Sequence, residues 1–437
     1  MAIIAAKFGG SSVADANQIR KVKSIIKGNP DRKYIVVSAP GKRCDDDTKI
    51  TDLLYRLKSE KESGGSYAQT LGAISERFLG IEADLEVSAG IAGEMETIES
   101  EIEKDASEDY LASRGEYLAA RLVAEFLGFD FVDAAGLVQF DEKGKLLSEE
   151  TNEALRKELA GRENAVIPGF YGTMPDGGIK TFSRGGSDIS GAIVARAVSA
   201  NMYENWTDVS GILMTDPRIV ENPKPIRHIT YGELRELSYM GATVLHESAV
   251  FPARQADIPI NIKNTNEPNH PGTIVSNTVK GENFAIISGI AGHKDFTFIT
   301  ITKPMMSEEV GILRKALAVL ERHDVSIEHI PGGVDTFSIV VANRFLQGKA
   351  DTIVKELRDE LDLDSVEVTG DVAIIATVGN GMVRRKGVSA KLFTALYKAG
   401  INIRMIDQGS SEVNIIVGVD NSDFEAAIRA IYKAFAE

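Results

Sequence analysis

The chain begins with MAIIAAKFGGSS, residues 1–12, in which a short apolar run ends at Lys7 and leads directly into Gly9, Gly10 and Ser11. The apolar run predicts a buried strand, and the two glycines let the backbone approach a ligand without obstruction by a Cβ atom. A helix directly after this loop would point free N–H groups at an anion, and Lys7 adds a positive charge. These residues predict either an anion-binding loop or a tight turn with a helix cap. A Walker-type loop does not fit, because its lysine follows the glycines.

Composition limits the class of protein. A chain of 437 residues is too long for one hydrophobic core and predicts about two to four domains. Its 49 basic and 64 acidic residues give a net charge of −15, so nucleic acid and membranes are not expected partners. No apolar stretch approaches the roughly 20 residues that cross a bilayer, and the start lacks the pattern of a secretion signal. With a single cysteine, Cys44, a cytoplasmic protein without disulfides is expected.

The first half of the chain has the pattern of an α/β domain. Residues 33–38 (KYIVVS) form a β-branched run of the kind buried in parallel sheets, and small residues follow it. The order strand, helix, strand predicts a three-layer α/β domain with a ligand crevice at the carboxyl ends of its strands. Gly9 and Ser38 would then lie side by side. Thr51, where the next helix is predicted to open, is a candidate cap or substrate contact.

Two further segments carry charge next to glycine. Glu116, in SRGE (residues 113–116), is placed by the pattern at a glycine-containing helix start. There it would receive a substrate ammonium or complement the helix dipole. In FSRGGSD, Arg184 is suited to a carboxylate or phosphate, and Asp188 falls at the start of a predicted helix, where a capping role is the alternative.

A third polar loop follows a strand-like segment, residues 203–208 (YENWTD). This loop, residues 211–218 (GILMTDPR), is turn-rich and basic. Three glycine-rich or polar loops, each at the end of a strand and each carrying charge, together predict phosphoryl transfer.

The last third of the chain contains an internal repeat. VGILRKALAVLERHDVSIEHI and KGVSAKLFTALYKAGINIRMI align without a gap, pairing Gly311 with Gly387 and Leu320 with Leu396. A gapless match across helix and strand implies duplicated modules. Each repeat has a ferredoxin-like βαββαβ pattern. Because neither repeat contains a catalytic constellation, regulation or dimerisation is the expected role.

Taken together, KFGGSS, SRGE, FSRGGSD, WTDVSGILMTDPR and the two repeats resemble the aspartate kinase family over essentially the whole chain. The resemblance implies a three-layer αβα amino acid kinase domain over residues 1–282, followed by two ferredoxin-like ACT units. It places the first ACT unit at residues 295–371, inserted into the second, which comprises residues 283–294 and 372–437.

The family pattern also implies roles for individual residues. Lys7 and Asp188 would be catalytic. The expected nucleotide contacts are Lys7, Gly9, Gly10, Ser11, Thr207, Asp208, Leu213 and Arg218. The expected aspartate contacts are Ser38, Thr51, Glu116, Arg184, Gly186 and Ser187.

Two residues depart from that pattern. Leu213 stands where an aromatic residue is common, and Thr243 stands where a lysine often occurs. Leucine cannot stack or hydrogen-bond like tyrosine, and threonine carries no charge, so contacts with the nucleotide base and phosphates are expected to differ.

The implied reaction transfers the γ-phosphoryl group of ATP to the β-carboxylate of L-aspartate, giving 4-phospho-L-aspartate, the first step of lysine, threonine and methionine biosynthesis. Mg²⁺ is expected to arrive with ATP, without a metal site built from protein side chains. No general base is needed, because a free aspartyl carboxylate has a pKa of roughly 4. A kinase acting on glutamate and a noncatalytic amino acid sensor with ACT repeats are the alternatives.

The resemblance further implies feedback inhibition through the ACT units and a homodimer or dimer of dimers formed by them. The expected effector contacts are Met306, Gly311, Ile312 and Glu328. Glu328 would meet a cationic side chain, which favours lysine as the effector, although threonine, or both amino acids together, stays open.

Overall fold

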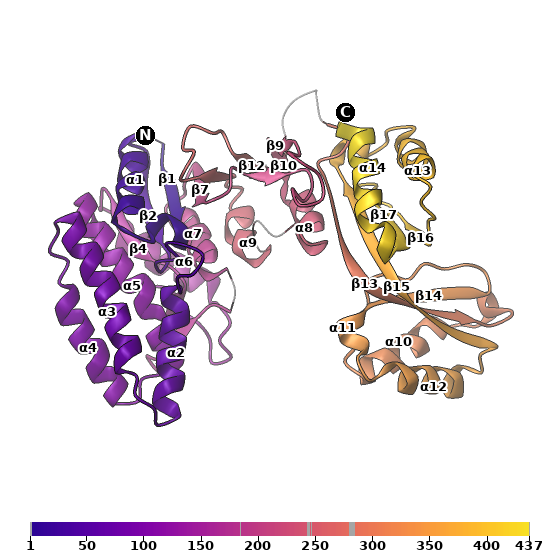
Figure 1. Ribbon diagram of the computed structural model, residues 1–437, viewed down its shortest axis with the longest axis horizontal. Coiled ribbons are helices and arrows are strands. Elements are labelled where there is room, and N and C mark those ends of the chain that lie inside the picture. Colours follow the sequence, from indigo (N-terminus) through magenta and orange to yellow (C-terminus); the bar gives the residue numbers. More distant parts are fainter. Residues whose placement is uncertain (1, 184, 243–244, 246, 279–284, 437) are drawn as a thin grey trace. The chain divides into compact units, whose positions relative to one another are not determined.

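The computed structural model describes residues 2–183, 185–242, 245, 247–278 and 285–436. Arg184 and Thr243 lie outside the described residues. The chain forms two compact units (Figure 1). The first comprises Met1–Ile212, Arg227–Tyr231 and Thr243–Val279, and the second comprises Leu213–Ile226, Gly232–Ala242 and Lys280–Glu437.

The first unit is built on an eight-stranded sheet in the order β10-β12-β11-β7-β1-β2-β4-β3. The strands are β1 (Ile4–Phe8), β2 (Arg32–Val37), β3 (Asp130–Phe131), β4 (Ala165–Pro168), β7 (Met202–Thr207), β10 (His228–Thr230), β11 (Ile260–Asn264) and β12 (Thr273–Ser276). Neighbouring strands run parallel except β11 and β12. A mostly parallel sheet explains why β1, β2 and β4 consist mainly of apolar residues: these strands are buried on both faces.

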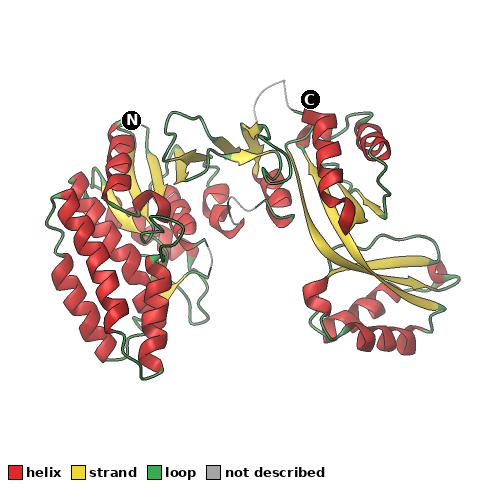
Figure 2. Cartoon of the chain, in the orientation of Figure 1, coloured by secondary structure: helices red, strands yellow, loops and turns green. Residues whose placement is uncertain are grey.

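Helices cover both faces of this sheet (Figure 2). On one face, Phe8, Ile35 and Val37 join a single hydrophobic cluster with residues of α1 to α5. On the other face, α7 packs against β1, β2 and β7, and α6 and α9 pack against α7. The helices are α1 (Ala16–Lys27), α2 (Ile50–Glu62), α3 (Ala68–Leu85), α4 (Ile91–Glu103), α5 (Glu108–Leu127), α6 (Ser148–Leu159), α7 (Gly186–Ala197) and α9 (Glu247–Gln255).

The opening segment differs in detail from its sequence pattern. Lys7 lies within β1, and a 3-10 turn, η1 (Gly10–Val13), precedes α1. The helix that was predicted to begin directly after the glycines starts at Ala16 instead, because Asp15 caps it by accepting a hydrogen bond from the Gln18 N–H. Two short pairs, β5 (Tyr171–Thr173) with β6 (Ile179–Thr181) and β8 (Ile212–Leu213) with β9 (Pro225–Ile226), complete the strands up to residue 230.

The second unit holds a five-stranded antiparallel sheet in the order β14-β13-β15-β17-β16. Its strands are β13 (Gly289–Thr302), β14 (Thr336–Ala342), β15 (Ser365–Val378), β16 (Met405–Asp407) and β17 (Asn414–Asp420). Strands β13 and β15 are long enough to serve both repeats: each crosses the expected junctions between the ACT units, at 294/295 and 371/372 respectively. Their register shifts close to these junctions, between His293 and Phe298.

Each repeat contributes helices to this sheet. In the first repeat, Ile299 and Ile301 of β13 pack into one cluster with apolar residues of α10 and α12. The second strand expected for this repeat is reduced to the isolated bridges of His329 with Val340 and of Gly332 with Phe337. The helical elements of the unit are α8 (Tyr231–Tyr239), η2 (Met306–Glu308), α10 (Ile312–Arg322), α11 (Asn343–Leu346), α12 (Ala350–Leu361), η3 (Asn380–Met382), α13 (Val388–Lys398), η4 (Asn421–Asp423) and α14 (Phe424–Ala436).

Candidate active site

Backbone hydrogen bonds join the loops at the carboxyl ends of the central parallel strands. Gly9 N–H donates to the Trp206 carbonyl at 2.9 Å, and Ser38 N–H donates to the Phe8 carbonyl at 3.1 Å. The Gly169 N–H extends the series across the sheet by donating to the Val37 carbonyl at 3.0 Å. The loops after β1, β2, β4 and β7 therefore meet at one edge, where a ligand crevice is expected in an open α/β sheet.

Glycine is required at the contact between the first two loops. The Gly41 N–H donates to the Gly10 carbonyl at 2.8 Å. A Cβ on Gly10 would lie 2.8 Å from the Ala39 carbonyl oxygen, and one on Gly41 would lie 2.8 Å from the Gly10 carbonyl carbon. Because these neighbours are backbone atoms, they cannot rotate away, and both positions exclude a side chain.

An ion pair between the buried Lys7 and the partly buried Asp188 lies at the edge next to these glycines. The Lys7 Nζ lies 2.6 Å from Asp188 Oδ1, and the Lys7 side chain is 8% exposed. Asn205, beside Lys7 on the neighbouring strand β7, donates from Nδ2 to the same carboxylate oxygen at 3.0 Å. Asp188 lies in the first turn of α7, as the sequence predicted. The Lys7 ammonium thus binds the Asp188 carboxylate and lies close to Gly9. A Cβ atom on Gly9 would be 3.5 Å from the Lys7 Nζ.

Glu116 is a second carboxyl group at this site, and unlike Asp188 it is buried. It lies in the middle of α5, so the prediction of a helix start was wrong and the helix-dipole interpretation fails. Glycine precedes it for a tertiary reason: a Cβ on Gly115 would lie 2.7 Å from the Ala39 Cβ. Packing of α5 on the loop after β2 brings Glu116 to the strand ends.

The buried surroundings of Glu116 disfavour the ionised form of its carboxyl group. Burial raises the pKa of Glu116 to about 8, although hydrogen bonds from Ala39 and Ser187 and the charge of Lys7 favour the ionised form. Among the described residues, none hydrogen-bonds to its Oε2. A buried carboxyl group with an oxygen left free is suited to a cationic ligand, which would restore ionisation at neutral pH.

The remaining predicted substrate contacts lie around this centre. Ser187 is buried in α7 and packs against Gly169, whose Cβ would lie 2.9 Å from the Ser187 Cβ. Gly186 opens the same helix, and Thr51 lies in the first turn of α2, where Lys49, not Thr51, is the cap residue. Arg184 was also predicted here but lies outside the described residues.

The predicted nucleotide contacts divide between the two compact units. Ser11, Thr207 and Asp208 belong to the first unit, and the Thr207 hydroxyl donates to Asp208 Oδ1 at 3.2 Å. Leu213 and Arg218 belong to the second unit. The Arg218 side chain is 88% exposed and forms an ion pair with Asp216 at 2.6 Å, so its guanidinium is held by its own loop.

The predicted effector contacts are distributed over the first repeat. Met306 and Ile312 are buried, and Gly311 has φ +85° at the start of α10. Glu328 accepts a hydrogen bond from the Tyr239 hydroxyl and lines a cavity of about 430 Å³. Arg344 and His293 also line this cavity, whereas Met306, Gly311 and Ile312 do not.

Two residues of the edge were missed by sequence reasoning. Asn205 binds Asp188, and Gly41 packs against Gly10. A signal for Asn205 was available, because an asparagine within the buried strand YENWTD needs a polar partner. Gly41 gave no such signal, since a glycine in a polar loop is the ordinary expectation.

Comparison with known proteins identifies the class. Residues 2–264 match the model of the amino acid kinase family, and residues 375–435 match an ACT domain. The chain is 38% identical to aspartokinase 3 of Bacillus subtilis, with 98% of each chain covered.

Solved structures agree with this match. Clostridium acetobutylicum aspartate kinase is similar with a TM-score of 0.92 and 50% identity, over 100% of both chains. Escherichia coli aspartokinase III is 28% identical over 100% of both chains. Its structure with aspartate and ADP gives a TM-score of 0.75, and its structure with lysine and aspartate gives 0.73.

The fold and site thus define an amino acid kinase with C-terminal ACT domains. Within that class, the chain belongs to the aspartokinase family, and its enzyme activity is that of an aspartate kinase. The fold class expected from the sequence is confirmed. In the part of the chain that the structure describes, no helix is both long and apolar enough to cross a membrane.

Proposed function

We propose that the edge formed by Lys7, Glu116 and Asp188 is the site where the γ-phosphoryl group of ATP passes to the β-carboxylate of L-aspartate. The carrying observation is the pairing of one buried lysine with Asp188 beside a glycine loop, 2.6 Å from ammonium to carboxylate. Nearby, Glu116 has a buried oxygen without a hydrogen-bond partner among the described residues. One group is suited to phosphate and the other to the α-ammonium of aspartate.

The chemistry requires electrostatic help and no base. The attacking carboxylate is ionised at neutral pH, so the obstacle is the approach of two anions. Lys7 and the amide of Gly10 would offset charge on the transferred phosphoryl group, and Asp188 would hold the Lys7 ammonium in place. Glu116 would fix the substrate's ammonium and thereby the line of attack.

Mg²⁺ would enter as MgATP. The described residues contain no group of three or more His, Cys, Asp or Glu side chains arranged as a metal site. The residues present fit a phosphate-borne ion nevertheless: Asp188 supplies carboxylate oxygens, and Asn205 has a buried Oδ1 to which no described residue donates. When bound, Mg²⁺ neutralises phosphate charge.

For regulation we propose lysine as the inhibitor, with Met306, Gly311, Ile312 and Glu328 as its contacts. The E. coli relative was crystallised with lysine. Glu328 carries the negative charge that the lysine side chain would meet. Threonine is the alternative effector. Because threonine has no cationic side chain, its binding would not depend on Glu328.

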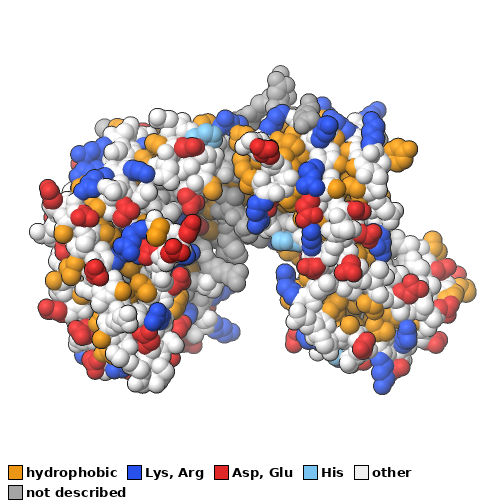
Figure 3. All heavy atoms as spheres, in the orientation of Figure 1, with side chains coloured by type: hydrophobic (Ala, Val, Ile, Leu, Met, Phe, Trp, Pro, Cys, Tyr) orange, Lys and Arg blue, Asp and Glu red, His pale blue; other side chains and the backbone are white. Residues whose placement is uncertain are grey.

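We further propose a homodimer or dimer of dimers through the ACT units, in the cytoplasm. Large apolar side chains are exposed in the second unit, and Figure 3 shows such side chains gathered on its surface. The exposed large apolar residues of the second unit include Met305, Val310, Leu313 and Val334. Exposed apolar patches of this kind favour association with another protein surface.

Coupled ADP release, measured with aspartate and separately with glutamate, tests the substrate. Turnover with aspartate alone is expected, whereas preference for glutamate or ATP binding without turnover would favour one of the alternatives.

Repeating the assay with lysine and with threonine identifies the effector. Glu328→Gln should raise the lysine concentration for half inhibition, and Glu367→Gln, an exposed change on β15, serves as the control. Equal lysine sensitivity of both variants would remove Glu328 from the effector site.

A further inference from the structure

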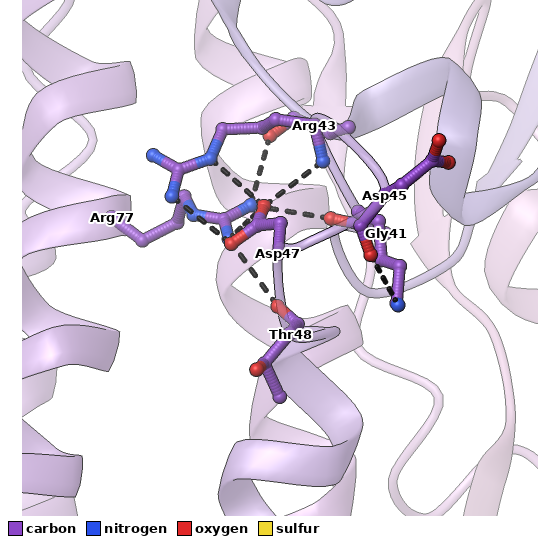
Figure 4. A network of polar contacts seen from close by, with 8 residues as sticks. Gly41, Arg43, Asp45, Asp47, Thr48 and Arg77 are labelled. Carbon is purple, nitrogen blue, oxygen red and sulfur yellow. Dashed lines mark hydrogen bonds and ion pairs between the residues drawn. The ribbon is translucent and has the colours of Figure 1, made fainter.

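A buried arginine, Arg77, lies outside the predicted site and binds three segments of the chain that lead to this site (Figure 4). Arg77 extends from α3, and its side chain is 5% exposed. Its Nη2 donates to Asp47 Oδ2 at 2.6 Å and to the Thr48 carbonyl at 3.3 Å. Its Nη1 donates to the carbonyls of Gly41 at 3.2 Å and Ala14 at 3.4 Å. One guanidinium therefore binds both ends of the loop between β2 and α2, together with the residue after η1.

The carboxylate that receives this guanidinium is itself fixed. Arg43 donates to Asp47 from its backbone N–H and from Nε, both at 2.9 Å to Oδ2, and from Nη2 to Oδ1 at 3.1 Å. These hydrogen bonds with Arg43 hold the pKa of Asp47 well below its usual range, so the carboxylate stays charged. Asp47 is thus clamped between two arginines, while Asp45 on the same loop points away from them in Figure 4.

The loop bound by Arg77 touches both proposed substrate positions. At one end, Gly41 hydrogen-bonds to Gly10 and leaves no room for a Cβ atom on either residue. At the other end, Thr48 leads into α2, whose first N–H, that of Ile50, donates to the Pro40 carbonyl at 3.1 Å. Thr51 lies in the first turn of this helix. A movement of the loop would therefore be transmitted to the glycines on one side and to Thr51 on the other.

Stability alone is a weak explanation for such a group. A buried ion pair contributes little net stability, since desolvation offsets much of the attraction between the charges. Apolar residues of similar volume would fill the same space. What an arginine adds is geometry: several N–H donors in a fixed plane can hold separate carbonyl groups at set positions.

We infer that Arg77 is a positioning residue for phosphoryl transfer, setting the distance between the phosphate-side Gly10 and the aspartate-side Thr51 through the loop of residues 41–48. The inference rests on the proposed function, because the two substrate positions come from it. It makes Arg77 and Asp47 one functional unit although neither reaches the reacting atoms.

The test compares Arg77→Met and Arg77→Lys with a matched arginine. Arg56 of α2 also pairs with a carboxylate, Glu60 at 2.7 Å, but its side chain is 63% exposed. Arg77→Met should raise the KM for aspartate and lower kcat, together reducing kcat/KM by roughly tenfold to a hundredfold, as expected for a misplacement near 1 Å. Arg77→Lys should fall between, because an ammonium keeps the Asp47 pair without the planar fork. Arg56→Met should match the wild type.

Both kinetic constants are measured on folded enzyme, verified by circular dichroism below each melting temperature. A purely structural role would lower the melting temperature and leave KM and kcat of the folded enzyme unchanged, which would overturn the inference. If Arg77→Met does not fold, Asp47→Asn replaces it, with Asp45→Asn as its control. Wild-type constants for Asp47→Asn would again contradict the inference.

A double-mutant cycle sharpens the result. If Arg77 and Asp47 act as a unit, the double variant should lose little more than either single variant, whereas additive losses would contradict the unit. Normal turnover of Lys7→Met would contradict the proposed active site itself, and this outcome is distinguishable from failure of the inference about Arg77. Loss of turnover in Lys7→Met together with wild-type kinetics of Arg77→Met would overturn this inference alone.

Discussion

Glu204 and Asn205, neighbours on β7, belong to two different ion-pair networks, one around Arg32 and the other around Lys7. Glu204 accepts from Arg32 Nε at 2.7 Å and Nη2 at 3.1 Å, and from Trp206 Nε1 at 2.8 Å. Asn205, which points to the other face, donates to the Asp188 carboxylate that also binds Lys7. Alternation along the strand sends one network towards α1 and the other towards α7.

The two networks differ in what they leave free. Both oxygens of Glu204 have donors. Around Lys7, in contrast, Asn205 Oδ1 and Glu116 Oε2 are buried and receive no hydrogen bond from any described residue. Leaving a buried polar atom unpaired costs about 1–3 kcal/mol. Removing one partner of the saturated pair is therefore expected to affect mainly folding, whereas changes around the unpaired atoms near Lys7 are expected to affect mainly ligand binding and turnover.

The largest effect is expected from breaking the saturated pair. Arg32→Met leaves Glu204 buried without its cation, which should lower the free energy of unfolding by about 3–5 kcal/mol. Denaturant titration measures this change, and kcat of the folded fraction should stay at the wild-type value. If Arg32→Met lost turnover while its stability stayed unchanged, the proposed difference between the two networks would be wrong.

Next in size is Lys7→Met, which should lower kcat by about 10²–10³-fold through loss of one preorganised cation. Steady-state ADP release provides the measurement. Lys58 of α2 offers the matched control, since it is equally buried and binds Asp105 at 2.9 Å. Turnover near the wild-type level in Lys7→Met, or an equal loss in Lys58→Met, would exclude the special role of Lys7.

A smaller effect concerns pH. Because the pKa of Glu116 is raised to about 8, the free enzyme is mostly protonated at this group at pH 7. Binding the substrate ammonium requires the ionised form, so the KM for aspartate should fall about tenfold per pH unit up to about pH 8 and then level off. Glu116→Gln should raise KM and abolish this slope.

The same group affects folding with a defined sign. A carboxyl group whose pKa is raised on folding favours the folded state at low pH, and this contribution is lost as pH rises from its ordinary value near 4.5 through about 8. The ligand-free enzyme should therefore lose stability over this range, and Glu116→Gln should lose less. An identical pH dependence of unfolding in both proteins would contradict the raised pKa.

The smallest expected effect is that of Asn205→Ala, which removes one hydrogen bond to Asp188 and should lower kcat/KM by roughly three- to tenfold. Asn152 of α6 is the control, because its Oδ1 is also buried and unpaired among the described residues. A larger loss than in Lys7→Met would place the main electrostatic group at Asn205 instead.

Much of this arrangement follows from local pattern. Apolar runs indicated β1 and β2, and the glycine-rich segments indicated the loops beside their carboxyl ends. The gapless repeat indicated two ferredoxin-like units. These features are local in the chain, which is why periodicity and turn residues report them.

The rest depends on tertiary approach. Glu116 was placed at a helix start because Gly115 resembles a helix breaker, yet this glycine makes room for Ala39 inside α5. Arg77 is one basic residue in a largely apolar helix, and only the folded loop brings four acceptors to its guanidinium. Neither distance is encoded by spacing along the chain.

The long strands β13 and β15 have a consequence for cooperativity. Val372 to Val378 of β15 pair with β17, whereas Ser365 to Val368 pair with the part of β13 that also carries β14. The two repeats thus share two continuous strands, although the register between these strands shifts at the junction, and we expect the unfolding of one repeat to disturb the strands of the other. The regulatory half should behave as one calorimetric unit, so that an amino acid bound to the first repeat raises the melting temperature of the second as well.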